Sequence, residues 1–277
     1  TQCLGRRNTV GQVNKKNKLM EESLKMLAEF RLLDDDFMTV VFDRNIEATQ
    51  LVLNVILGRN DMEVLEVTAQ REYKNPITGG RTIELDIYAR DSEEKIYNIE
   101  VQRADSGADV HRARFHSSML DTRMLRANQK FNEIHDSYVI FITENDCMGQ
   151  GLPMYHVERV VQETSTLFQD GAHIIYVNGN YKNNDTPVGR LMHDFRCTSA
   201  MDMFYEELKK PVRHFKETEG GQRQMCKAME ERIDRERIEV LFETAKSLMK
   251  NMDISAEQAM EAMNVSAEDK EVLMKRL

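Results

Sequence analysis

The segment IELDIYARDSEEKIYNIEVQR, residues 83–103, reads as two β-strands joined by a charged loop. Apolar and polar residues alternate in each half, and a period of two is typical of strands that bury one face. We therefore expect strands over residues 81–90 and 96–103, with DSEEK as the connecting loop. Three polar side chains stand inside these otherwise apolar runs: Asp86, Glu100 and Gln102.

The alternation assigns each side chain to a face of the predicted hairpin. In the first strand it gives two sets: Ile83, Leu85 and Ile87 on one face, and Glu84, Asp86 and Tyr88 on the other. In the second strand, Glu100 and Gln102 lie opposite to Ile99 and Val101. If the loop closes a hairpin, Asp86 and Glu100 can face one another, and two carboxylates at that range repel unless a cation lies between them. Hard oxygen ligands suit Mg²⁺ or Mn²⁺. The alternative is a pair of solvated acids on an amphipathic hairpin.

Upstream of this hairpin, the pattern predicts a helix, a strand and a turn. Residues 45–57 are apolar on one helical face and stop at Gly58, a residue suited to a helix C-terminus. Residues 62–70 read as a strand, and NPITGG at 75–80 as a turn. The hairpin therefore extends to a meander of three strands.

Downstream, long apolar runs indicate strands that are buried on both faces. The elements that we predict are a helix over 107–131, strands over 136–143 and 172–178 with a helix around 155–168 between them, and a helix over 200–217 that ends near Gly220 and Gly221.

The composition shifts after these two glycines, because residues 222–277 are rich in Met, Glu and Arg and contain no Gly or Pro. Ser255 and Ser266 each open an SAE tripeptide that fits a helix N-cap, so we predict a long helix followed by two short ones. We interpret this appendage as an interaction module through which a homodimer could form, and a helix-turn-helix is the alternative. The predicted domains are a basic arm with a lead-in helix (1–30), a central domain (31–220) and the helical appendage (221–277).

The composition excludes several classes of protein. The chain has 277 residues, and no window approaches 18 consecutive apolar residues, so a transmembrane helix is not expected. The four cysteines are scattered without a CxxC pair, which argues against a disulfide framework and a zinc site and favours a reducing cytoplasm. The net charge of −9 would discourage a nucleic-acid partner if the basic residues were evenly spread.

The basic residues are not evenly spread. Between Arg103 and Arg126 there are five Arg, no Lys and three acids. At helical spacing, Arg112, His116, Met119, Arg123 and Arg126 share one face. The guanidinium fork matches phosphate oxygens, so an acid pair beside this helix suits phosphodiester hydrolysis. A solvated helix with internal ion pairs is the alternative.

The spacing of Asp86, 13 residues and then Glu100-Val101-Gln102 resembles the motif of PD-(D/E)XK nucleases, and more narrowly of the recombination-promoting nuclease/putative transposase group. The stretches that carry the likeness are LLDDDFMTVVFDRN (32–45), RTIELDIYARD (81–91), YNIEVQR (97–103) and DGAHIIYVN (170–178). The resemblance covers roughly residues 30–220. It implies an α/β restriction-endonuclease-like core, a central mixed β-sheet flanked by helices, followed by a helical appendage.

The resemblance also assigns roles to residues. Asp86 and Glu100 would bind the metal ion with the carbonyl of Val101, and Glu47 would be the supplementary helix acid, although it also suits the helix N-terminal dipole. The chain departs from the motif twice, because Leu85 stands before Asp86 in place of Pro and Gln102 stands in place of Lys.

From these observations we expect a metal-dependent DNA endonuclease that uses Mg²⁺ or Mn²⁺. Gln102 would position the attacking water. Arg103, or a second metal ion, would compensate for the missing Lys charge. The predicted phosphate contacts are Arg103, Arg112, Arg114 and Arg123. The alternative is a catalytically inactive remnant of a mobile element that binds DNA or protein.

Overall fold

The computed structural model describes residues 23–277, so most of the predicted basic arm lies outside the described residues. The chain divides into two compact units, Thr1–Gln222 and Arg223–Leu277. Among the described residues, every helix is too short or too polar to cross a membrane.

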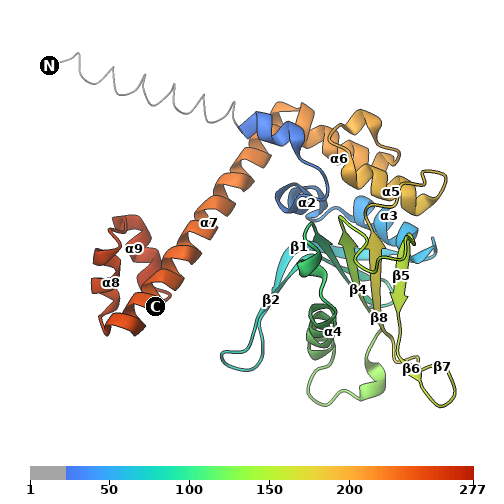
Figure 1. Cartoon of the computed structure of the whole chain (residues 1–277), viewed down its shortest axis with the longest axis horizontal. Coiled ribbons are helices and arrows are strands. Elements are labelled where there is room, and N and C mark those ends of the chain that lie inside the picture. The colour runs from blue at the N-terminus through green and yellow to red at the C-terminus, as the bar shows by residue number, and fades with distance from the viewer. Residues whose placement is uncertain (1–22) are drawn as a thin grey trace. The chain divides into compact units, whose positions relative to one another are not determined.

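A six-stranded mixed sheet forms the centre of the first unit (Figure 1), in the order β1-β2-β3-β4-β8-β5. The strands are β1 (Val64–Tyr73), β2 (Ile83–Asp91), β3 (Ile96–Gln102), β4 (Ser137–Thr143), β5 (Met154–Val157) and β8 (Ala172–Asn178). The first three form the expected antiparallel meander, whereas β3, β4 and β8 run parallel and β5 returns antiparallel.

Both faces of the central strands are covered. On one face, Val139, Phe141 and Tyr176 pack in a buried cluster with Ala113 and Leu120 of α4. The alternate residues of β4 and β8 are also buried, and α2 and α3 contact β1 while α3 contacts α5 and α6. A mixed sheet flanked by helices is the expected fold class, which is confirmed.

The helices of the first unit include α2 (Asp35–Phe42), α3 (Ile46–Leu57), α4 (Val110–Met124), α5 (Pro187–Arg196) and α6 (Glu206–Glu217), with short 3₁₀ turns at Asp105–Ala108, Phe131–Glu133 and Ala200–Asp202. Residues 23–29 are also helical, in the part of the chain where the lead-in helix is predicted. The predicted helix at 45–57 is confirmed. Its N-cap Asn45 accepts the Ala48 N–H, and it stops at Gly58, whose φ of +65° is the left-handed conformation that glycine adopts without strain.

The helix predicted around 155–168 is wrong. This segment instead forms β5 and a small hairpin of β6 (Val160–Val161) and β7 (Thr166–Leu167). Ser165 and Gln169 have φ values of +56° and +57°, which a right-handed helix does not allow. The chain therefore turns at these two left-handed residues, where the sequence pattern predicts a continuous helix.

The helix predicted over 107–131 is shorter than expected. α4 ends at Met124 because Leu125 is extended, and Asn128 has a φ of +79°. Arg126 consequently lies beyond the helix, so it cannot share the predicted helical face.

The helix predicted over 200–217 is also shorter, because α6 begins only at Glu206. The glycines expected at its end lie inside the first turn of α7 (Glu219–Met252). A Cβ on Gly221 would lie 2.1 Å from the carbonyl oxygen of His214, so the close approach of the chain to α6 accounts for this glycine. The sequence pattern missed α5, although Pro187 at its first position and Thr186 as its N-cap are ordinary start signals.

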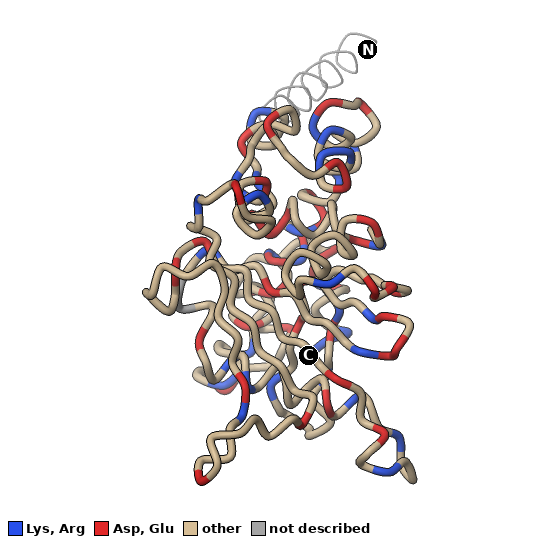
Figure 2. Tube along the Cα trace, turned by 90° about the vertical axis from the view of Figure 1, so that its right-hand side faces the viewer, with Lys and Arg blue, Asp and Glu red and all other residues tan. Residues whose placement is uncertain are grey.

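The second unit has the predicted long helix followed by two short ones, α8 (Ala256–Ala262) and α9 (Ala267–Met274). Ser255 and Gln258 form a complete capping box, and Ser266 caps α9 through the Asp269 N–H. Figure 2 shows Lys and Arg interspersed with Asp and Glu along the chain.

Candidate active site

The predicted acids lie where β2 and β3 separate. The ladder between these strands ends at the pair Ile87 and Ile99, and Asp86 and Glu100 are the next residues along. Here side chains take the place of ladder bonds. The Asp86 N–H donates to Glu100 Oε1 at 3.4 Å, and the Val101 N–H donates to Asp86 Oδ2 at 2.9 Å. The structure therefore brings both carboxyl groups into one gap in the sheet.

The regular alternation of β2 also breaks at this gap. In the pairing with β1, Gln70 stands opposite Asp86 between the pairs Ala69–Ile87 and Arg71–Leu85, and its φ is +49°. Ile83 and Leu85 pack in the same buried cluster as Tyr88, whereas Ile87 does not belong to it. The prediction that Ile83, Leu85 and Ile87 share one face is therefore wrong, because a left-handed residue in β1 disturbs the two-residue period.

Asp86 carries a strongly perturbed carboxyl group. Burial raises its pKa well above the ordinary value, and the charge of Glu100 raises it further. Asp35, the first residue of α2, adds to the rise, while the Val101 N–H and the Arg112 charge oppose it. The raised pKa thus reflects first the removal of this carboxyl group from water and second its repulsion by Glu100.

Glu100 is fully buried, and two of its partners come from α4. Arg112 donates from Nη2 to Glu100 Oε2 at 2.9 Å, and His116 Nδ1 lies 3.4 Å from Oε1. Because His116 and Met119 are also buried, the helical face predicted to hold phosphate instead faces the sheet. Arg112, His116 and Met119 share this face, whereas Arg126 lies beyond the helix, and the face points toward the sheet and not toward a ligand.

Gln102 lies at the end of β3, and its amide is half-buried. Arg112 Nη1 donates to its Oε1 at 3.5 Å. A Cβ on Gly107 would lie 2.0 Å from the same oxygen, so the absence of a side chain at 107 leaves the space that this amide occupies.

Among the residues that the structure describes, the others predicted for the site form no hydrogen bond or ion pair with Asp86 or Glu100. Arg103 pairs with Asp34 at 2.8 Å and Glu144 at 3.3 Å. Arg114 is exposed on α4. Arg123 donates to the Lys74 carbonyl and lies over the Tyr73 ring. Glu47 is exposed in the first turn of α3.

The donor set in the gap fits a hard divalent cation. Two carboxyl groups converge there, and the excess negative charge is what a cation would neutralise. The Val101 N–H points into the gap, and the N–H and C=O of one strand residue leave on the same edge, so the Val101 carbonyl faces the gap as well. Three oxygen ligands are therefore available from β2 and β3.

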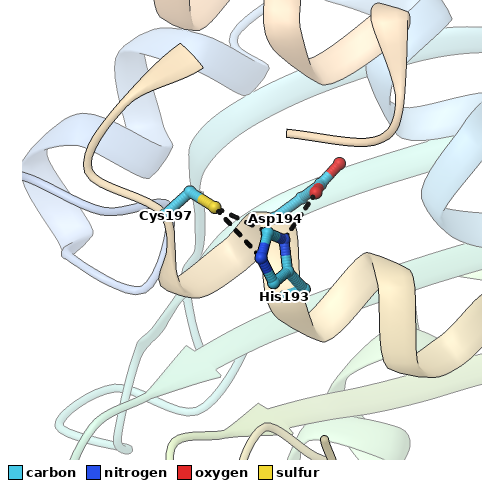
Figure 3. Close-up of side chains that lie close together, drawn as sticks. All are labelled: His193, Asp194 and Cys197. Carbon is cyan, nitrogen blue, oxygen red and sulfur yellow. Dashed lines mark hydrogen bonds and ion pairs between the residues drawn. The ribbon is translucent and has the colours of Figure 1, made fainter. Parts of the chain in front are cut away.

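A second group of side chains, His193, Asp194 and Cys197, is close enough to be considered as a metal site (Figure 3), since its ligand atoms lie within 4.8 Å of one another. The Asp194 oxygens, however, accept the N–H groups of Phe204 and Tyr205, both at 2.8 Å. Burial raises the pKa of the Cys197 thiol to about 11, which disfavours the thiolate that binds metals. We therefore interpret Asp194 as the residue that fixes the loop before α6.

The sequence pattern missed three contributors to the acidic gap: Asp35, His116 as a partner of Glu100, and Gly107. Asp35 stands in a run of three acids at a helix start, where a capping role is the ordinary interpretation. For His116 the sequence indicates only a place on a helical face. For Gly107 the sequence contains no signal, because its role depends on the path of the chain after β3.

Comparison with curated proteins and with solved structures gave no match. The family model for PD-(D/E)XK nuclease family transposases matches residues 41–275, which include β2, β3 and α4 as well as most of the C-terminal unit. With the mixed sheet and the two acids at the separation of β2 and β3, this match shows that the chain belongs to the PD-(D/E)XK nuclease family transposases.

Proposed function

We propose that this protein is a divalent-metal-dependent DNA endonuclease that hydrolyses phosphodiester bonds. The observation that carries the proposal is the convergence of Asp86 and Glu100 in one gap, where burial and mutual repulsion raise the pKa of Asp86. Membership of a nuclease family supports DNA as the substrate.

Asp86, Glu100 and the Val101 carbonyl would hold the ion, Mg²⁺ or Mn²⁺, which when bound lowers the pKa of a water and polarises a phosphoryl oxygen. The Val101 N–H fixes the Asp86 carboxyl group against the backbone of β3. Gln102 both donates and accepts hydrogen bonds, so it can orient a water molecule. In the hydrolysis, the water oxygen bonds to phosphorus and the water releases a proton to solvent. The bridging P–O bond breaks, and the leaving oxygen takes up a proton from solvent.

The phosphate contacts need revision under this proposal. Arg103 pairs with Asp34 and Glu144. Arg112 pairs with Glu100 in the gap itself, and Arg114 is exposed on α4. We retain Arg114 as a DNA contact, and we assign Arg123 to holding the β1–β2 hairpin through Lys74 and Tyr73.

The test is nicking of supercoiled plasmid DNA in Mg²⁺ or Mn²⁺ by Asp86→Asn and Glu100→Gln. Each variant keeps the shape of the side chain and removes its charge, and we expect a loss of at least about 100-fold, the size typical for one electrostatic contact in an active site. Glu84→Gln is the matched control, because Glu84 is an exposed acid of the same strand. Nicking by Asp86→Asn at the wild-type rate would reject the proposal. A wild-type protein that binds DNA without cleaving it, and without response to metal, would instead support the inactive remnant.

We also propose that the second unit mediates a homodimer in a cytoplasmic protein. α7 exposes Ile233 and Val240, which are seven residues apart and so lie on one side of the helix. Sedimentation equilibrium of the whole chain and of an Ile233→Glu/Val240→Glu variant tests this, because a dimer held by α7 should dissociate in the variant.

A further inference from the structure

The third position of the family motif normally holds a cation, and in this chain it does not. The K of (D/E)XK would stand two residues after Glu100, where the sequence has Gln102. An amide can orient a water molecule but cannot offset the negative charge that gathers on a phosphoryl group during hydrolysis. If the chain cleaves DNA, the positive charge at this place therefore comes from another element of the chain or from a second metal ion.

The guanidinium of Arg112 occupies the place where that charge is needed. Its Nη2 lies 2.9 Å from Glu100 Oε2, and its Nη1 lies 3.5 Å from Gln102 Oε1. One side chain thus touches both the second acid and the amide that replaces Lys. About 37% of the Arg112 side chain is exposed, so the guanidinium also has an open side toward solvent.

Buried neighbours hold this guanidinium in place. His116 Nε2 lies 3.4 Å from Arg112 Nε, and His116 is itself 3% exposed, with Asn98 Nδ2 3.0 Å from its Nδ1. The His116 ring also packs on Phe141 of β4, with centroids 6.2 Å apart. Arg112 is therefore presented from a rigid helix over buried contacts, as a preorganised charge requires.

Two other arginines near the end of β3 contact acids other than Asp86 and Glu100. Arg103, which follows Gln102 directly, pairs with Asp34 and Glu144. Arg31 pairs with the same two acids. The expectation that Arg103 compensates for the missing Lys is not supported by these contacts.

We propose that Arg112 supplies from α4 the positive charge that β3 lacks at Gln102, so that the motif cation of this chain has moved from the strand to the helix. This inference rests on the proposed nuclease function. Arg112 would donate hydrogen bonds to the phosphoryl oxygens while the water oxygen bonds to phosphorus and the bridging P–O bond breaks. Because the guanidinium stays protonated throughout, it gives up no proton. The attacking water releases its proton to solvent, and the leaving oxygen takes its proton from solvent.

The experiment compares Arg112→Met with the double variant Gln102→Lys/Arg112→Met in single-turnover cleavage of a labelled duplex. We expect Arg112→Met to lose about 100-fold or more in rate. Restoring the motif Lys on β3 should return at least about tenfold of that loss. Arg44→Met is the control for removing an arginine, because the Arg44 side chain is 89% exposed.

Two measurements without cleavage separate this role from a structural one. Thermal denaturation shows whether Arg112→Met is folded, and Arg112→Lys retains a charge beside Glu100 should the methionine variant unfold. Calorimetric titration with Mn²⁺ should give binding to Arg112→Met at least as tight as to the wild type, because Glu100 keeps its place on β3 and loses a competing cation.

Each outcome bears on the inference. Wild-type cleavage by Arg112→Met would overturn it. So would a folded, Mn²⁺-binding Arg112→Met that Gln102→Lys does not rescue; in both cases the nuclease proposal stands. If the wild-type protein itself shows no metal-dependent cleavage, the nuclease proposal fails and this inference fails with it. Rescue by Gln102→Lys supports both.

Discussion

Replacing Gly107 by Ala should displace the Gln102 amide without changing any residue that is proposed to act in hydrolysis. The new Cβ would lie 2.0 Å from Gln102 Oε1, whereas contacts of real Cβ atoms are essentially never closer than 3.0 Å. The amide must therefore move by about 1 Å. Misplacement of a positioning group by this distance can cost about 100-fold in rate.

The fold should tolerate the same substitution. The atom that must move is the far end of a flexible side chain, and the backbone at Gly107 does not have the left-handed conformation that only glycine adopts easily. We expect the free energy of unfolding to change by less than about 1 kcal/mol. The predicted signature is a large loss of activity in a protein of nearly normal stability.

The assay is single-turnover cleavage of a duplex, combined with urea denaturation of the same preparation. Gly220→Ala is the matched control, because a Cβ at that position meets no atom within 4 Å. Wild-type activity in a folded Gly107→Ala protein would refute the role of Gln102 as a positioning residue. A protein that unfolds would instead show that the chain around Gly107 cannot accept a Cβ by moving the Gln102 side chain alone.

Three further predictions concern charge and local stability. Below the ordinary pKa of 3.8, Asp86 is protonated in both the folded and the unfolded state, and between 3.8 and its raised pKa the folded state binds more protons. The stability of the wild type should therefore fall as pH rises through this window. Asp86→Asn should flatten this dependence and be the more stable protein at pH 7, as measured by urea denaturation without divalent ions. A steeper dependence in the variant would contradict the burial argument. The pKa of the Cys197 thiol rises from 9.0 to about 11, so its alkylation by iodoacetamide at pH 7.5 should be about 100-fold slower than in the unfolded chain. Mass spectrometry of the labelled peptide measures this rate, and rapid labelling would show that the thiol is not buried. Ser255→Ala should cost about 1 kcal/mol of local stability through loss of the capping box, seen as faster amide hydrogen exchange in α8, and unchanged exchange there would show that the cap contributes little.

The fold could be predicted from the sequence largely because its strands have distinct patterns. Continuous apolar runs indicate the buried strands β4 and β8, and alternating runs indicate β2 and β3. The segment between β4 and β8 has no such pattern. Its path depends on left-handed turns at Ser165 and Gln169, which a helical period in the sequence does not indicate.

The part of the candidate site on the strands could be predicted from the sequence, whereas the part on α4 could not. Positions 86 and 100 follow from a hairpin and its register, so the approach of the two acids could be expected. The direction of the α4 face could not, because a mixed polar and apolar helix leaves open which side packs on the sheet. Ala113 and Leu120 pack on the sheet, and Glu100 and Asn98 on β3 offer Arg112 and His116 buried polar partners on that side.

The meander that holds the acidic gap is assembled from neighbouring segments of chain, and this has a consequence for the order of folding. Asp86 and Glu100 are separated by one short loop, whereas the pairing of β3 with β4 must wait for α4 to cross over the sheet. Contacts that close short loops form sooner than those that close long ones. We therefore expect Asp86 and Glu100 to come together while both are still hydrated. They lose this water only later, when α4 docks on the sheet and Arg112 reaches them.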